Sequence, residues 1–160
     1  MATTANRHSN YVVTPKTLTQ KVCIALGLFF IMVGLIGVVM PGFLGMHLSL
    51  VHNLIHLGSG SLALWSGYSD DTKKSYVYCL SFGVLFSVLG VFGFVFGSPG
   101  YPSVGNLEAD DYLLRIIPNA FEIGTSDHLL YFILGATLLA SAVFGNRAIS
   151  GKHGNTLKRS

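Results

Sequence analysis

Residues 22–40 read VCIALGLFFIMVGLIGVVM, and the uncharged stretch that begins there decides the fold. No Asp, Glu, Lys or Arg occurs over residues 22–69, a run long enough for two spans of roughly 20 apolar residues each. Pro41 and Gly42 interrupt this run and predict a turn between the two spans. A second uncharged run, residues 75–107, supplies a third span.

The composition of the whole chain agrees with a membrane protein. Of its 160 residues, 51% are hydrophobic and only 11% are charged, about half the charged share of an ordinary soluble domain. We therefore predict an all-α integral membrane protein, a four-helix transmembrane bundle. The expected spans are residues 22–40, 49–67, 76–96 and 128–145, with an N-terminal tail over 1–21, an outer loop over 97–126 and a basic C-terminal tail over 146–160.

Basic residues predict the orientation, because cytoplasmic loops are enriched in Lys and Arg. Nine of the ten flank the same side of the expected spans: Arg7, Lys16, Lys21, Lys73, Lys74, Arg147, Lys152, Lys158 and Arg159. Only Arg115 falls on the other side, together with most of the acidic residues. We expect both termini in the cytoplasm of a bacterial cell, a multi-pass location in its plasma membrane and no cleavage of the first span. The lipid bilayer is the expected partner, with a second copy or another membrane protein as further candidates; nucleic acid is not expected.

The four spans contain an internal repeat. Cys23 and Phe30 of the first span recur as Cys79 and Phe86 of the third, at an offset of 56 residues. The second and fourth spans match at an offset of 75 residues, so the chain reads as two parallel helical-hairpin repeats. Eight glycines share these offsets and are expected to let helices pack closely: Gly27, Gly34, Gly37, Gly60, Gly83, Gly90, Gly93 and Gly135.

Polar side chains in the second and fourth spans form the candidate site. His52 and His56 stand one turn apart on a small and polar face of the second span. The repeat places Asp127, His128 and Tyr131 at the same depth of the fourth span. Ionisable residues inside a membrane are functional candidates, so a polar centre is expected in the outer half of the bilayer.

These spans resemble an uncharacterised family of small four-span bacterial membrane proteins. That family carries the motif HNxxHxxxG in its second span and DNxxHxxxG in its fourth. The first motif is intact here as HNLIHLGSG, residues 52–60, whereas the second reads DHLLYFILG, residues 127–135. His128 replaces the usual asparagine and Tyr131 the usual histidine. The resemblance covers residues 22–145 and implies the four-span fold, but it brings no activity with it.

Several functions fit the polar centre. Its side chains, including Asn53 and Tyr131, could hydrogen-bond across the bundle and fix the helix register, which suits a structural or accessory membrane component. Alternatively, His52, His56, Asp127 and His128 could bind a divalent metal ion, since histidines at i and i+4 with a carboxylate suit zinc or iron. A haem between His52 or His56 and His128 is a weaker cofactor hypothesis. A proton or small-solute relay is the remaining alternative.

The outer loop is expected to pack at the membrane interface, with a lid over the polar centre or a docking site for a partner as the alternatives. Residues 110–123 mix apolar and charged side chains and are expected to form an interfacial helix broken near Pro118. The sequence has no nucleophile elbow, phosphate loop or CxxC pair, so no catalytic residue is assigned and enzymatic activity is not expected.

Overall fold

A computed structural model describes residues 15–105 and 108–156, with side chains as far as Gly145. Its helices are α1 (Leu18–Val39), α2 (Leu50–Tyr68), α3 (Thr72–Phe96) and α4 (Thr125–Thr156), and a short 3-10 helix, η1 (Phe43–Gly45), follows α1. Strands β1 (Ser98–Gly100), β2 (Asp110–Ile117) and β3 (Phe121–Ile123) lie between α3 and α4. Of the basic residues in the two expected tails, the structure describes Lys16 and Lys21. The side chains of Arg7, Arg147, Lys152, Lys158 and Arg159 lie outside the described part.

Three of these helices, α1, α3 and α4, are long and apolar enough to cross a membrane. Helix α2 is shorter and carries polar side chains along one face, His52, Asn53 and His56 among them, although it contains no charged residue. Large apolar side chains on the outer surfaces are left exposed, for example Leu35 at 59% and Phe132 at 50%. Such surfaces are expected where a helix faces lipid, so the chain is a helical membrane protein.

Local signals set the ends of the helices. Thr17 and Gln20 form a capping box at the start of α1, and the Ser49 hydroxyl accepts the His52 N–H at the start of α2. Asp71 caps α3 by accepting the Lys73 N–H. Each helix begins and ends within four residues of the expected span, except that α4 continues beyond residue 145 as a helix to Thr156.

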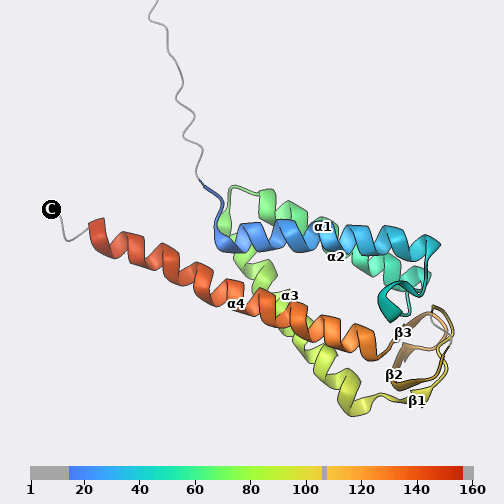
Figure 1. The fold of residues 1–160 in the computed structure, drawn as a ribbon. Helices are drawn as coiled ribbons and strands as arrows, with labels where there is room; N and C mark the ends of the chain where they lie inside the picture. The colour runs from blue at the N-terminus through green and yellow to red at the C-terminus, as the bar shows by residue number, and fades with distance from the viewer. Residues whose placement is uncertain (1–14, 106–107, 157–160) are drawn as a thin grey trace, which may run out of the picture.

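Neighbouring helices pack in two pairs, α1 with α2 and α3 with α4 (Figure 1). Glycines mark the closest approach in both pairs. A Cβ atom at Gly60 would lie 2.9 Å from the carbonyl oxygen of Gly27, and one at Gly135 would lie 2.9 Å from that of Gly83. Backbone oxygens cannot withdraw as a flexible side chain can, so each crossing requires glycine.

The two pairs meet through residues of α1 and α3 that are separated by 56 positions in the sequence. The hydroxyls of Thr19 and Ser75 lie 3.1 Å apart, and the sulfur atoms of Cys23 and Cys79 lie 3.5 Å apart. The rings of Phe30 and Phe86 follow, with centroids 5.4 Å apart. Each of these residues therefore contacts its own counterpart in the other pair.

A three-stranded antiparallel sheet, in the order β1-β2-β3, covers one end of the helices. The interfacial helix expected over residues 110–123 is therefore wrong. Pro118 and Asn119, which has φ 64°, form a turn closed by the Ala120 N–H donating to Ile117 (3.0 Å), and this turn pairs β2 with β3. Proline followed by a residue with positive φ is typical of a type II turn, so Pro118 connects two strands. Phe121 and Ile123 of β3 are buried against the helices.

Candidate functional site

The candidate site lies directly beneath the sheet and is centred on His52 of α2, which is fully buried. Its Nδ1 atom is 3.1 Å from the backbone oxygen of His47, and its Nε2 atom is 2.7 Å from the hydroxyl of Tyr131 on α4. A carbonyl oxygen only accepts, so Nδ1 carries the proton of the neutral ring. Nε2 then accepts from the Tyr131 hydroxyl, and this bond joins the two helix pairs.

Asp127 stands beside this bond in the first turn of α4 and is also fully buried. One carboxylate oxygen, Oδ2, accepts the Gly124 N–H at 2.9 Å, which helps to cap α4. The other, Oδ1, lies 4.0 Å from Nε2 of His52 and has no hydrogen-bond partner. His52 and Asp127 hold matching positions in the repeat expected from the sequence, and the structure brings them into contact.

One turn deeper, four rings form a continuous row of contacts across the molecule. His56 stacks on Phe30 with centroids 5.5 Å apart, and Tyr131 stacks on Phe86 at 5.4 Å. Phe30 and Phe86 contact each other in the middle, and His56 also stacks on His52 at 4.7 Å. The Nε2 atom of His56 is buried without a hydrogen-bond partner. His52, His56, Asp127 and Tyr131 thus form one group, which we call the polar centre.

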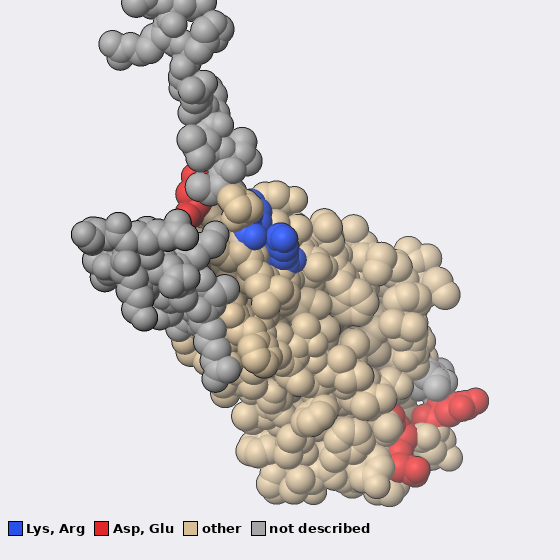
Figure 2. Space-filling view, turned by 60° about the vertical axis from the view of Figure 1, so that its left-hand side comes forward, with Lys and Arg blue, Asp and Glu red and all other residues tan. Residues whose placement is uncertain are grey.

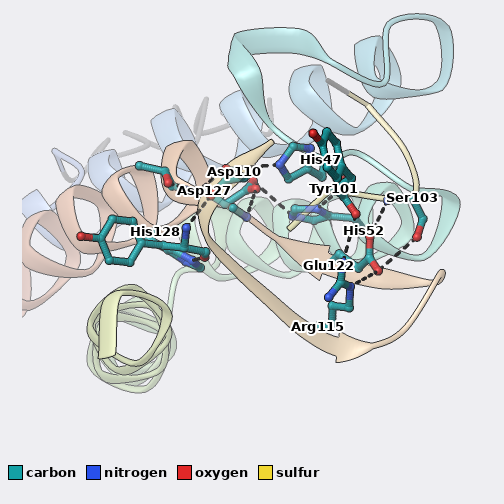
Figure 3. A network of polar contacts seen from close by, with 12 residues as sticks. His47, His52, Tyr101, Ser103, Asp110, Arg115, Glu122, Asp127 and His128 are labelled. Carbon is teal, nitrogen blue, oxygen red and sulfur yellow. Dashed lines mark hydrogen bonds and ion pairs between the residues drawn. The ribbon is translucent and has the colours of Figure 1, made fainter. Parts of the chain in front are cut away.

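His128 and Asn53 lie outside this group. His128 Nε2 donates to the backbone oxygen of Tyr112 in β2 at 2.7 Å, and its ring packs edge-on against Phe94. In Figure 3 His128 lies apart from His52. Asn53 donates to the backbone oxygen of Leu48, 3.4 Å away. His128 thus binds the backbone of β2, and Asn53 binds the backbone just before α2. The polar centre therefore contains fewer side chains than the sequence predicts.

The metal hypothesis finds no set of three ligands in the described residues, and the haem hypothesis stays a prediction. Among the residues that the structure describes, no group of three or more His, Cys, Asp or Glu side chains is placed to hold a metal ion. Both ring nitrogens of His52 are already engaged, and Nε2 of His128 is held by Tyr112. Within the polar centre, Nε2 of His56 and Oδ1 of Asp127 are the buried atoms that have no hydrogen-bond partner.

A second polar network connects the sheet to the helices, and little in the sequence indicates it. Asp110 at the start of β2 accepts the backbone N–H of Tyr112 at 2.9 Å and the Thr125 hydroxyl at 2.8 Å. It also lies 3.5 Å from Nε2 of His47 (Figure 3). Burial raises the pKa of Asp110, but the hydrogen bonds from Tyr112, Thr125 and His47 outweigh burial and hold the pKa below its usual value.

Glu122 on β3, like Asp110 on β2, is a carboxylate that accepts several hydrogen bonds. Its carboxylate accepts the Ser103 N–H at 2.7 Å and the Nε–H of Arg115 at 3.2 Å, while Arg115 also donates to the Tyr101 oxygen. Burial raises the pKa of Glu122, and these bonds more than compensate, so the pKa is lowered. Nothing in the sequence pairs His47 with Asp110 or Ser103 with Glu122, because each pair is far apart along the chain. The Pro118–Asn119 turn is the one local signal that could have revealed the sheet.

No family model matches the chain, and no match is found among the curated proteins or the solved structures. The family resemblance of the two motifs therefore stays a prediction.

Proposed function

We propose that the protein is a four-span structural or accessory component of a bacterial plasma membrane. The hydrogen bond between Tyr131 and His52 carries this proposal, because it joins α4 to α2 in the interior, where no water competes for it. With Asp127 beside it, the bond fixes how the two helix pairs sit against each other. The polar centre then acts as a brace, and the protein acts on its partners, another membrane protein or a second copy, through its outer surfaces.

The proposed architecture is two parallel hairpin repeats, α1 with α2 and α3 with α4. The matching glycine crossings support it, as do the contacts of Thr19, Cys23 and Phe30 with their counterparts 56 residues later. Residues related by a two-fold axis contact their own equivalents where that axis passes between them. Helix α2 would be the fourth span, with its polar face turned inward and its apolar face toward lipid.

The proposed orientation places the sheet outside the cell and both ends of the chain in the cytoplasm. The described lysines lie at the end opposite the sheet, and the acidic residues Asp110, Asp111 and Glu122 belong to the sheet. Figure 2 shows a broad uncharged band between the charged atoms at the two ends. A bilayer core requires such a band, and the lysine-rich end is expected on the cytoplasmic side.

The test compares Tyr131→Phe with the unchanged protein in mild detergent, in preparations that carry no histidine tag. Removing the hydroxyl leaves Nε2 of His52 without a donor, and we expect a loss of about 0.6 kcal/mol, with about 1.7 as the upper bound for such bonds. The unfolding midpoint in a detergent titration gives this loss. Tyr76→Phe, a partly buried position on α3 outside the polar centre, is the matched control.

Metal content distinguishes the brace from the metal hypothesis. We expect less than stoichiometric iron or zinc by plasma mass spectrometry in both preparations. Stoichiometric metal that disappears in a folded His52→Ala, His56→Ala variant would overturn the proposal in favour of a ligand site. An unfolding midpoint that is unchanged in Tyr131→Phe would equally remove its basis.

A further inference from the structure

A groove opens between α2 and α3 at the end of the molecule opposite the sheet. Its volume is about 360 Å³, and its walls are mainly apolar, with Leu62 and Trp65 from α2 and Val77 and Phe82 from α3. Trp65 is 58% exposed and Val77 is 48% exposed, so the groove faces outward, where lipid would surround the helices. The groove is thus a mainly apolar surface recess between the two helix pairs.

Two lysines stand at the mouth of this groove, Lys73 and Lys74 in the first turn of α3. The ammonium group of Lys74 lies 4.6 Å from the centre of the Trp65 ring, a cation–π contact that holds it over the groove. Within the described part of the chain, neither ammonium group has a carboxylate within ion-pair distance. Asp71 also lines the mouth, and its Oδ1 atom accepts the Lys73 N–H as the cap of α3, so the two lysine charges exceed the one carboxylate charge that lines the groove.

We propose that this groove is a binding site for an anionic phospholipid. One acyl chain would lie along Leu62, Val77 and Phe82, and the headgroup phosphate would meet the ammonium groups of Lys73 and Lys74. Tryptophan at the level of the headgroups and lysines that extend toward them are the usual features of a membrane interface. A zwitterionic lipid brings its own cation to the same place, so charge complementarity favours a lipid with net negative charge.

The single tryptophan of the chain reports on this site directly, because Trp65 lines the groove. The full chain is placed in phosphatidylcholine vesicles that contain a minor share of brominated phosphatidylglycerol or, separately, the same share of brominated phosphatidylcholine. Bromine on the acyl chains quenches tryptophan fluorescence on contact. We expect stronger quenching by the brominated phosphatidylglycerol, since that lipid should be enriched in the groove.

Two double variants with the same loss of charge separate the groove from the general attraction of a basic surface. Lys73→Gln, Lys74→Gln should lower the preference for phosphatidylglycerol by more than the factor of about five per lysine that the general attraction of a basic surface provides. Lys16→Gln, Lys21→Gln removes two charges from the same end of the molecule but none from the groove, and should lower the preference by no more than that general attraction. Circular dichroism spectra that match the unchanged protein show that each variant is folded.

Three results would overturn the proposal. Equal quenching by the two brominated lipids in the unchanged protein would show that the groove does not select for charge. A preference that survives the loss of Lys73 and Lys74 would place the headgroup elsewhere. An equal loss in both double variants would assign the preference to the surface potential of this end of the protein.

Discussion

Alanine in place of Gly60 tests the helix packing most sharply. The added Cβ atom would lie 2.9 Å from the backbone oxygen of Gly27 and 3.0 Å from the backbone nitrogen of Ile31. Real Cβ atoms essentially never lie as close as 2.9 Å to another heavy atom, and the Gly27 oxygen belongs to the backbone, so α1 and α2 must move apart. Forcing extra volume into a well-packed interior costs about 1–3 kcal/mol, which is the destabilisation that we expect.

Gly58 provides the matched control, because it lies on the same helix and a Cβ atom there would meet nothing within 4 Å. Alanine favours a helix over glycine by about 1 kcal/mol in water, and by less where the unfolded chain keeps its helices in detergent. Gly58→Ala should therefore leave stability unchanged or raise it slightly. The same substitution two residues apart should thus differ in its effect on stability by about 1–4 kcal/mol.

The assay is unfolding of the detergent-solubilised protein by a titration with sodium dodecyl sulfate, followed by Trp65 fluorescence. Gly135→Ala belongs in the same series, since its Cβ atom would lie 2.9 Å from the oxygen of Gly83 and should destabilise the second pair in the same way. If Gly60→Ala unfolds at the same midpoint as Gly58→Ala, α1 and α2 do not cross at Gly27 and the packing described for this pair is wrong.

Two further predictions concern the ends of the molecule. The lowered pKa values of Asp110 and Glu122 stabilise the sheet above their ordinary pKa values of 3.8 and 4.5, and this contribution is lost as the pH falls through the still lower pKa values of the folded state. Hydrogen exchange measured by mass spectrometry should show that the amides of β2 and β3 lose protection below pH 4.5 while the helices stay protected. The double variant Asp110→Asn, Glu122→Gln should lose the same protection at neutral pH. A sheet that stays protected in acid would contradict the assigned hydrogen bonds. At the other end, the sulfur atoms of Cys23 and Cys79 lie 3.5 Å apart, so a membrane-permeant oxidant such as iodine should form a disulfide between them within one chain. Mass spectrometry should show the loss of two hydrogens, and Cys79→Ser should abolish that loss. Failure to join them in the folded protein would mean that α1 and α3 do not meet there.

The helices could be predicted because their signals are local. Uncharged runs, the Pro41–Gly42 break and the capping residues Thr17 and Ser49 each act within a few positions of the chain. The outer loop could not be predicted in the same way. Residues 110–117 carry apolar and charged side chains in an order that suits a helix or a strand, and pairing with residues far along the chain decided between them.

The polar centre was foreseen only in part, for a related reason. His52, His56, Asp127 and Tyr131 were all identified as candidates, because ionisable and polar residues are rare in such spans. Depth along the helix predicts that His128 belongs to the same group. Depth along a helix does not determine where a ring points, and the Tyr112 oxygen of β2 is the partner that turned His128 toward the sheet.

The sequence by itself determined the apolar helices, the separation of charge between the two ends and the positions of small residues, since all three follow from composition and spacing along one chain. Only the tertiary structure decided that β2 is a strand, that His52 meets Asp127 and Tyr131, and that Lys73 and Lys74 border an apolar groove. Those features depend on which backbone and side-chain atoms face each other across different helices and strands, and their hydrogen bonds and contacts form only once the chain has folded.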